Sequence, residues 1–298
     1  MQFLTFILVY PLIWFVSILP FRIIYFISDV LCFLLYHVIR YRRKVIQQNL
    51  QLVFPEKTPT EISQLVKKHY CHFTDLLLET VKTLSISEKE LNKRLVYKNT
   101  EVLRELYRKQ KSVLLICGHY GNWEWLGNME KFMPHKGHAV YKPAKNNYFN
   151  NLIYTIRARF GAVPVDKNNI IKTFVKNQKE KILGLYLMVA DQSPKLNNTR
   201  YWTSFLGVKV PVFVGTEVLA KKVNAAVVFL NVTKRKRGYY EASFKLLEDY
   251  PEKVPNYTLT DSFLRALENQ IYAKPEYYFW THKRFKHRDK IPEMLCYN

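Results

Sequence analysis

The sequence is poor in glycine and cysteine. Nine glycines in 298 residues exclude collagen-like and low-complexity chains and argue against a glycine-rich nucleotide-binding loop. No C-x-x-C metal or redox pair is present, because the cysteines are far apart in the sequence, at Cys32, Cys71, Cys117 and Cys296. This cysteine usage is explained most simply by a reducing, cytoplasm-facing compartment.

Acidic residues are scarce as well. The chain has 24 Asp and Glu against 46 Lys and Arg, a formal net charge of +22, which attracts phosphates, anionic lipid surfaces or nucleic acid without choosing among them. An apolar fraction of 48% excludes intrinsic disorder, and a mean hydropathy of -0.19 excludes a protein that is mostly membrane-spanning. The length suffices for one large α/β domain.

The amino-terminal segment 1–44 is expected to anchor the protein to a membrane. Residues 1–21 contain no charge, and as a helix rising 1.5 Å per residue they are long enough to cross a hydrocarbon core of about 30 Å. A second apolar stretch, 23–39, carries only Asp29 and His37, and a basic block follows at 40–44. Either 1–21 spans the bilayer and an interfacial helix follows, or two helices lie against the membrane; a buried hairpin of a soluble protein is the alternative.

The remainder, 45–298, reads as one α/β domain. Thr58, Pro59 and Glu61 predict the start of an amphipathic helix with a capping box. Continuous apolar runs predict strands at 112–117, 138–142, 184–190 and 225–230. Helical patterns separate or follow them at 123–133, 147–160, 169–180, 212–222 and 258–273. Unbroken apolarity indicates strands buried on both faces, hence a mainly parallel central sheet flanked by helices.

Polar side chains follow two of these strands, where ligands bind in parallel sheets. Residues 118–124 (GHYGNWE) follow the strand at 112–117. We expect Asn122 to cap the next helix and Glu124 to lie in its first turn, where the helix dipole favours a carboxylate. Folded back on His119, Glu124 would hold one imidazole nitrogen and make the other a general base, as an alcohol substrate requires. Ordinary polar capping is the other interpretation.

The segment 118–124 resembles the H-x-x-x-x-(D/E) acyltransferase motif, and further segments resemble the lipid A secondary acyltransferases, the lauroyl/myristoyl acyltransferase family. These segments follow the order of that family: Arg43, Asn49-Leu50, Phe54-Pro55, Tyr141-Lys142-Pro143, 157–161, Asp191-Gln192, Phe205-Leu206-Gly207 and 278–286. The ordered set spans nearly the whole chain. It is specific for the family and does not fix the substrate.

The resemblance implies transfer of a fatty acyl chain from an acyl-carrier-protein thioester, or less often coenzyme A, to a hydroxyl of a membrane lipid. The acceptor it implies is a lipid A precursor of outer-membrane lipopolysaccharide; a lysophospholipid, aminolipid or pigment is the alternative. His119 would be the base and Glu124 its orienting partner, with no metal or cofactor. The basic residues after the apolar runs then place the catalytic domain on the cytoplasmic face of a bacterial inner membrane.

Six further residues are candidates for substrate binding. By family match, Arg159 is expected to bind acceptor phosphate or the developing oxyanion, because guanidinium suits both; complementing a helix end is its other interpretation. Asp191 and Gln192 line the site or cap a loop, and Lys142 stands where relatives commonly have arginine. The last two candidates are Asn122 and Arg284.

Two basic segments have competing interpretations. The run 234–237 before Gly238 predicts a hairpin-like turn, and a solvated loop is a simpler explanation of its charges than a functional role. The segment 280–288 mixes aromatic and basic side chains, which suits contact with lipid headgroups or with an acidic carrier protein. A C-terminal strand with a solvated basic face is its other interpretation. A nucleic-acid-binding protein is the rival class, but zinc-finger spacing and RNA-binding aromatic motifs are absent from the sequence. A catalytically silent membrane-surface scaffold is the other rival.

Overall fold

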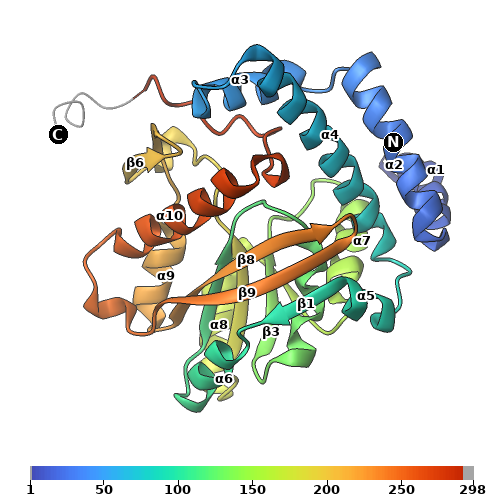
Figure 1. Cartoon of the computed structure of the whole chain (residues 1–298). Helices are drawn as coiled ribbons and strands as arrows, with labels where there is room; N and C mark the ends of the chain where they lie inside the picture. The colour runs from blue at the N-terminus through green and yellow to red at the C-terminus, as the bar shows by residue number, and fades with distance from the viewer. Residues whose placement is uncertain (1, 291–298) are drawn as a thin grey trace.

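The core of the protein is a seven-stranded sheet between helical layers (Figure 1), seen in a computed structural model that describes residues 2–290. The strands, in the order β1-β9-β8-β2-β5-β3-β4, are β1 (Leu95–Lys98), β2 (Val113–Cys117), β3 (Lys136–Tyr141), β4 (Val163–Asp166), β5 (Gly184–Val189), β8 (Ala226–Lys236) and β9 (Tyr239–Glu248). All neighbours are parallel except β8 and β9, which form an antiparallel hairpin. A separate small hairpin comprises β6 (Trp202–Phe205) and β7 (Val208–Pro211).

Helices cover both faces of this sheet. They are α1 (Gln2–Ile18), α2 (Phe21–Phe33), α3 (Arg43–Val53), α4 (Pro59–Lys82), α5 (Glu88–Arg94), α6 (Glu101–Arg108), α7 (Asn147–Ala158), α8 (Ile170–Lys179), α9 (Gly215–Val223) and α10 (Thr258–Ala273). Along β2, Leu114 and Ile116 join one hydrophobic cluster while Val113 and Leu115 join the other. The central strand is therefore buried on both faces, as its unbroken apolarity predicts.

The predicted fold class is confirmed, with boundaries that differ by a few residues. The four predicted strands correspond to β2, β3, β5 and β8, and the predicted helix at 258–273 is α10. The capping box of Thr58 and Glu61 is present at the start of α4. The segment predicted as a helix at 123–133 is instead a 3₁₀ helix, Glu124–Phe132. The pattern missed β1 and β4, which are only four residues long, and β9, whose apolar residues alternate with polar ones.

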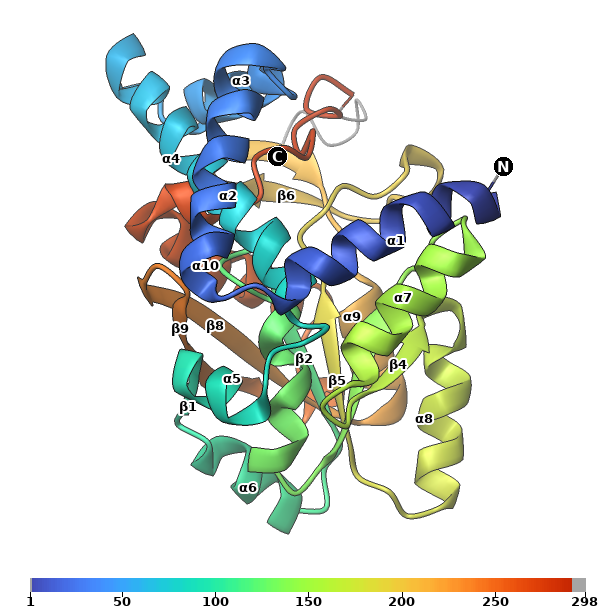
Figure 2. The ribbon, with the colours of Figure 1, turned by 90° about the vertical axis from the view of Figure 1, so that its right-hand side faces the viewer.

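The amino-terminal helices are packed on the domain and also expose a broad apolar surface. In Figure 2, α1 crosses over α7 while α2 runs beside α4. The ring of Phe6 lies 5.5 Å from that of Tyr148, and Ser28 donates to Asp75 at 2.8 Å. Phe21–Val38 is long and apolar enough to cross a membrane, and only 22% of it is buried. The candidate span is therefore the second apolar stretch, whereas the first helix ends at Ile18 and its apolar part, Thr5–Ile18, is shorter.

The basic hairpin between β8 and β9 forms ion pairs with two helices of the same chain. Its expected turn is present, but it is not merely solvated: Lys234 and Arg237 contact Asp75 of α4 at 3.1 Å and 2.7 Å, and Arg237 also pairs with Asp29 of α2. Asp75 is buried, so its charge is balanced by these two cations. These ion pairs therefore connect α2, α4 and the β8–β9 hairpin of the sheet.

We expect Asp75→Asn to destabilise the protein by about 3 kcal/mol, because it leaves two cations facing a neutral amide in a buried site. The matched control is Asp29→Asn, which removes an acceptor of the same Arg237 from a side chain that is 59% exposed; its cost is less than about 1 kcal/mol. Denaturant unfolding of both variants in detergent measures the difference. Equal losses would show that the buried ion pairs add nothing beyond a surface ion pair.

Candidate functional site

The candidate site lies where β2 and β5 end. The two strands pair in parallel, with Cys117 opposite Val189. A titratable residue follows each strand two positions later, His119 after Cys117 and Asp191 after Val189. His119 Nδ1 lies 2.5 Å from Asp191 Oδ1. The strand register thus brings together two groups that are 72 residues apart in the sequence.

Asp191 stabilises the charged form of His119. Burial alone lowers the pKa of the imidazole, but the carboxylate of Asp191 outweighs it, with a smaller contribution from Glu124, and the pKa of His119 lies above its usual value. Burial acts on Asp191 in the opposite sense, yet His119 holds the pKa of that carboxyl below its usual value. Each group therefore stabilises the charged form of the other, and the Asp191 carboxylate makes the imidazole of His119 more basic.

The other ring nitrogen faces Gln192. The Gln192 amide nitrogen lies 3.2 Å from His119 Nε2. With Nδ1–H donating to Asp191, Nε2 carries the lone pair that accepts from this amide. Two aromatic rings enclose the imidazole: Trp123 meets it edge-on at 5.0 Å and Phe279 stacks on it at 5.8 Å. His119 is therefore a largely buried base whose Nε2 lone pair is held by the Gln192 amide.

Glu124 does not occupy the position expected of it. The carboxylate receives Arg157 Nη2 at 3.0 Å and Trp123 Nε1 at 3.1 Å, while Asp191 takes the place beside Nδ1 of His119. The 3₁₀ helix begins at Glu124 itself, which directs this side chain toward α7, the helix that carries Arg157. The orienting contact predicted between Glu124 and His119 is thus replaced by one between Asp191 and His119.

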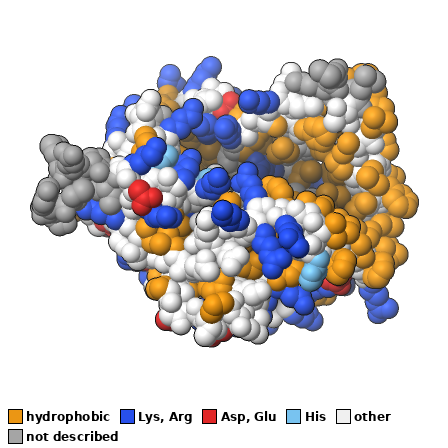
Figure 3. Space-filling view, turned by 90° about the horizontal axis from the view of Figure 1, so that it is seen from above, with side chains coloured by type: hydrophobic (Ala, Val, Ile, Leu, Met, Phe, Trp, Pro, Cys, Tyr) orange, Lys and Arg blue, Asp and Glu red, His pale blue; other side chains and the backbone are white. Residues whose placement is uncertain are grey.

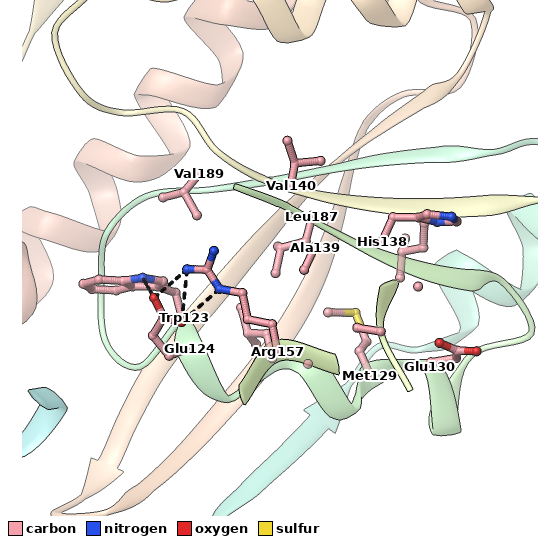
Figure 4. A pocket seen from close by; sticks show the side chains of 15 residues that line it. Trp123, Glu124, Met129, Glu130, His138, Ala139, Val140, Arg157, Leu187 and Val189 are labelled. Atoms are coloured by element: carbon pink, nitrogen blue, oxygen red, sulfur yellow. Dashed lines mark hydrogen bonds and ion pairs between the residues drawn. The ribbon is translucent and has the colours of Figure 1, made fainter. Parts of the chain in front are cut away.

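A narrow, mainly apolar cavity begins at this ion pair. Trp123, Glu124 and Arg157 lie at one end of it, and Met129, Glu130 and His138 at the other (Figure 4). Between them the wall is formed by the aliphatic side chains of Ala139, Val140, Leu187 and Val189. The ring of Trp123, which lines this end of the cavity, also lies 5.0 Å from the ring of His119. The shape and lining of the cavity suit an aliphatic chain.

The remaining candidate residues lie at different distances from this centre. Asn122 is fully buried, and its Oδ1 accepts from the backbone N of Trp125 at 3.1 Å, the cap that the sequence predicts. Lys142 is exposed between β3 and α7. Arg159 donates to the carbonyl oxygen of Thr83 near the end of α4, which agrees with its helix-end interpretation.

Arg284 is buried behind the loop that carries Asp191. Its guanidinium lies 3.2 Å from the carbonyl oxygen of Pro211 and 3.4 Å from Ser193 Oγ. Trp280 and Phe285 are buried with it, and 278–290 contains no strand. The basic C-terminal segment therefore supports the site from within, and the strand alternative for 280–288 is wrong.

Two residues of the site escaped prediction from the sequence. Arg157 entered only as part of the family segment 157–161, although its spacing from Arg159 provided two guanidinium candidates on one helix end. Phe279 left no signal by itself, because its contact with His119 depends on the hydrogen bond from its backbone N to His119 O at 3.0 Å. Within residues 2–290, no group of three or more His, Cys, Asp or Glu side chains is arranged to hold a metal ion.

Replacing the carboxylate beside His119 tests the electrostatics directly. We expect Asp191→Asn to move the pKa of His119 from above its usual value to below it, because burial then acts without the opposing charge. Glu124→Gln is the control and lowers the pKa less. Titration of the imidazole by nitrogen-resolved NMR gives both values, and an unchanged pKa in Asp191→Asn would contradict the pairing.

The chain is similar to known proteins over nearly its whole length. The sequence matches the family described as bacterial lipid A biosynthesis acyltransferase over residues 1–287. It is 25% identical over 280 residues to the lipid A biosynthesis lauroyltransferase of Escherichia coli (strain K12), covering 93% of this chain and 89% of that protein. It is 20% identical to the palmitoleoyltransferase of the same organism, covering 91% of this chain and 87% of the relative. The family match includes the amino-terminal helices and the His119 loop, and this chain is a member of the bacterial lipid A biosynthesis acyltransferase family.

Proposed function

We propose that this enzyme transfers a fatty acyl chain from a thioester to a hydroxyl of a lipid A precursor, at the cytoplasmic face of a bacterial inner membrane. The observation that carries the proposal is the His119–Asp191 pair, whose imidazole contacts Trp123 at one end of an apolar cavity. Acylation of an alcohol by a fatty thioester requires a base for the hydroxyl proton and an apolar cavity for the acyl chain. Membership of the family supports the same reaction.

His119 takes the proton from the acceptor hydroxyl. Its Nε2 lone pair is the acceptor, and Asp191 stabilises the imidazolium that forms. The alkoxide oxygen attacks the thioester carbonyl, the carbon–oxygen bond forms, and the tetrahedral intermediate then expels the sulfur. The proton held on His119 passes to the departing thiolate, so that the ring returns to its starting state. Gln192 holds the place at Nε2 that the hydroxyl takes on binding.

Arg157 is positioned to stabilise the oxyanion. Its guanidinium lies at the cavity mouth, where the thioester carbonyl stands when the acyl chain fills the cavity. Glu124 fixes the guanidinium with hydrogen bonds from Nη2 at 3.0 Å and from Nε at 3.3 Å, and the ring of Tyr141 lies 5.4 Å from it. A pre-positioned cation stabilises charge that develops in the transition state. In this mechanism Asp191 orients the base, and Glu124 orients the guanidinium that stabilises the oxyanion.

The donor is an acyl-carrier-protein thioester, with coenzyme A as the alternative, and no metal or cofactor takes part. The net charge of +22 favours an acidic carrier protein by long-range attraction. We assign acceptor phosphate to Lys142 and Arg159, two exposed cations that precede and follow α7; Arg159 reaches the Thr83 carbonyl oxygen through Nη1, and the rest of its guanidinium serves this role. The buried Arg284 supports the Asp191 loop instead of contacting substrate.

The acceptor reaches the site from the lipid phase. From above, the surface is hollowed between the apolar side chains of the amino-terminal helices and a rim that includes lysine and arginine side chains (Figure 3). Leu8 is 78% exposed and Phe26 68% exposed, and large exposed apolar patches mark sites of membrane or protein contact. These helices lie on the membrane, and the basic residues at 40–44 contact its anionic headgroups.

The reaction is tested with purified protein, a lipid A precursor that lacks a secondary acyl chain, and acyl-carrier-protein or coenzyme A thioesters. We expect His119→Ala to lower kcat by about 10²- to 10⁴-fold, the usual contribution of a general base. The exposed His37→Ala is the matched control and retains activity. Mass spectrometry of the lipid product measures transfer. A wild-type enzyme that acylates a lysophospholipid but not the lipid A precursor would refute the proposed acceptor.

The cavity is tested by filling it. We expect Ala139→Leu to reduce transfer of the longest accepted acyl chain by about tenfold or more, while shorter chains are still transferred, because added methylene groups occupy the space of the chain. The exposed Ala273→Leu on α10 adds the same atoms away from the cavity and is the control. Competition between donors of different length gives the ratio. An unchanged chain-length profile would show that the acyl chain binds elsewhere.

A further inference from the structure

Glu79 of α4 is a fully buried carboxylate that takes no part in the proposed mechanism. It receives three side-chain hydrogen bonds, from Tyr25 of α2 at 2.9 Å, from Asn122 at 2.8 Å and from Tyr240 of β9 at 2.8 Å. Its own exposure is 0%. One side chain thus joins α2, the loop after His119 and strand β9 of the sheet.

Burying this carboxylate is unfavourable, and burial raises its pKa to about 7. A well-packed apolar side chain would fill the same space without the desolvation cost. The groups around Glu79 explain why an acid is present: each of them presents an N–H or O–H to it, and a carboxylate offers two oxygens that only accept. A glutamine would turn an N–H toward one of these donors.

The contact with Asn122 leads directly to the site. Asn122 lies within the stretch from His119 to Glu124, and both ends of its buried amide are used: Nδ2 donates to Glu79 and Oδ1 accepts from the backbone N of Trp125. The backbone carbonyl of Glu79 also accepts from Trp125 Nε1 at 3.0 Å. The rest of the loop offers little freedom, since Gly121 has a φ of +63° and its N donates to Tyr277 O.

We propose that Glu79 is a positioning residue that fixes, through Asn122, the loop on which His119 and Glu124 stand. This inference rests on the proposed acyl transfer. Glu79 lies behind the loop and touches neither the imidazole nor the cavity, so that it acts only through geometry. A displacement of the loop moves His119 relative to Asp191, and Glu124 relative to Arg157, and positioning errors of about 1 Å cost on the order of 10²-fold in rate.

Glu79→Gln is the direct test, with kcat, KM and the melting temperature measured together. We expect kcat to fall on the order of 10²-fold with KM within about threefold of wild type, because the loop and not the binding surface is disturbed. Tyr240→Phe is the matched control: it removes one hydrogen bond from the same carboxylate but keeps the ring that packs against Trp125 and leaves the Glu79–Asn122 contact in place. We expect it to lower the melting temperature and leave kcat within about threefold of wild type.

Asn122→Ala breaks the same link from the other side and completes a double-mutant cycle. If the two residues act through one contact, the double variant loses no more kcat than the worse single variant; additive losses would overturn the proposal. So would a Glu79→Gln enzyme with kcat within threefold of wild type, or a Tyr240→Phe enzyme that loses as much kcat as Glu79→Gln. Should Glu79→Gln fail to fold, Asn122→Ala against Tyr240→Phe gives the same decision. A wild-type protein without transferase activity would refute the proposed function instead.

Discussion

The parallel pairing of β2 with β5 is the constraint on which the site depends. Two strands that run side by side end at the same edge of the sheet, and their register sets which residues after them become neighbours. Cys117 lies opposite Val189, and the backbone N of Ala190 donates to Cys117 O at 3.2 Å. His119 and Asp191 stand two residues beyond that register, so a slip of one residue would part the imidazole from its carboxylate.

The central part of the fold could be predicted from the sequence because burial leaves a direct trace in it. Strands such as 113–117, covered on both faces, are continuously apolar, and the start of α4 has its cap, proline and acid in adjacent positions. The histidine was identified in the same way, at the polar end of a buried strand. Contacts that depend on strand register or tertiary packing left no such trace: Asp191 was a candidate, but only the pairing of two distant strands made it the partner of His119.

Glu124 illustrates the limit of local reasoning most clearly. Its spacing from His119 is compatible with a contact between them, and the sequence offers nothing that separates this contact from one with a distant arginine. The outcome depends on where the 3₁₀ helix begins and on α7 bringing Arg157 to the same place, and neither is a property of the motif. The prediction of a solvated loop at 234–237 is wrong for the same reason. The sequence of the turn does not show that Asp75 of α4 forms ion pairs with Lys234 and Arg237.

Acidic and basic side chains are divided unequally between the interior and the surface of the protein. Among the described residues, the buried acids are Asp75, Glu79, Asp191, Glu217 and Glu268, and the buried bases are Lys82, Arg94 and Arg284. The interior therefore uses acids out of proportion to their scarcity in the sequence, which leaves the outer surface more basic than the net charge indicates. Charges on the surface act at long range, whereas buried ones act on their neighbours. The same composition thus gives buried acids that hold α2 and the loop after β2 in place, and a basic exterior whose field attracts anionic partners.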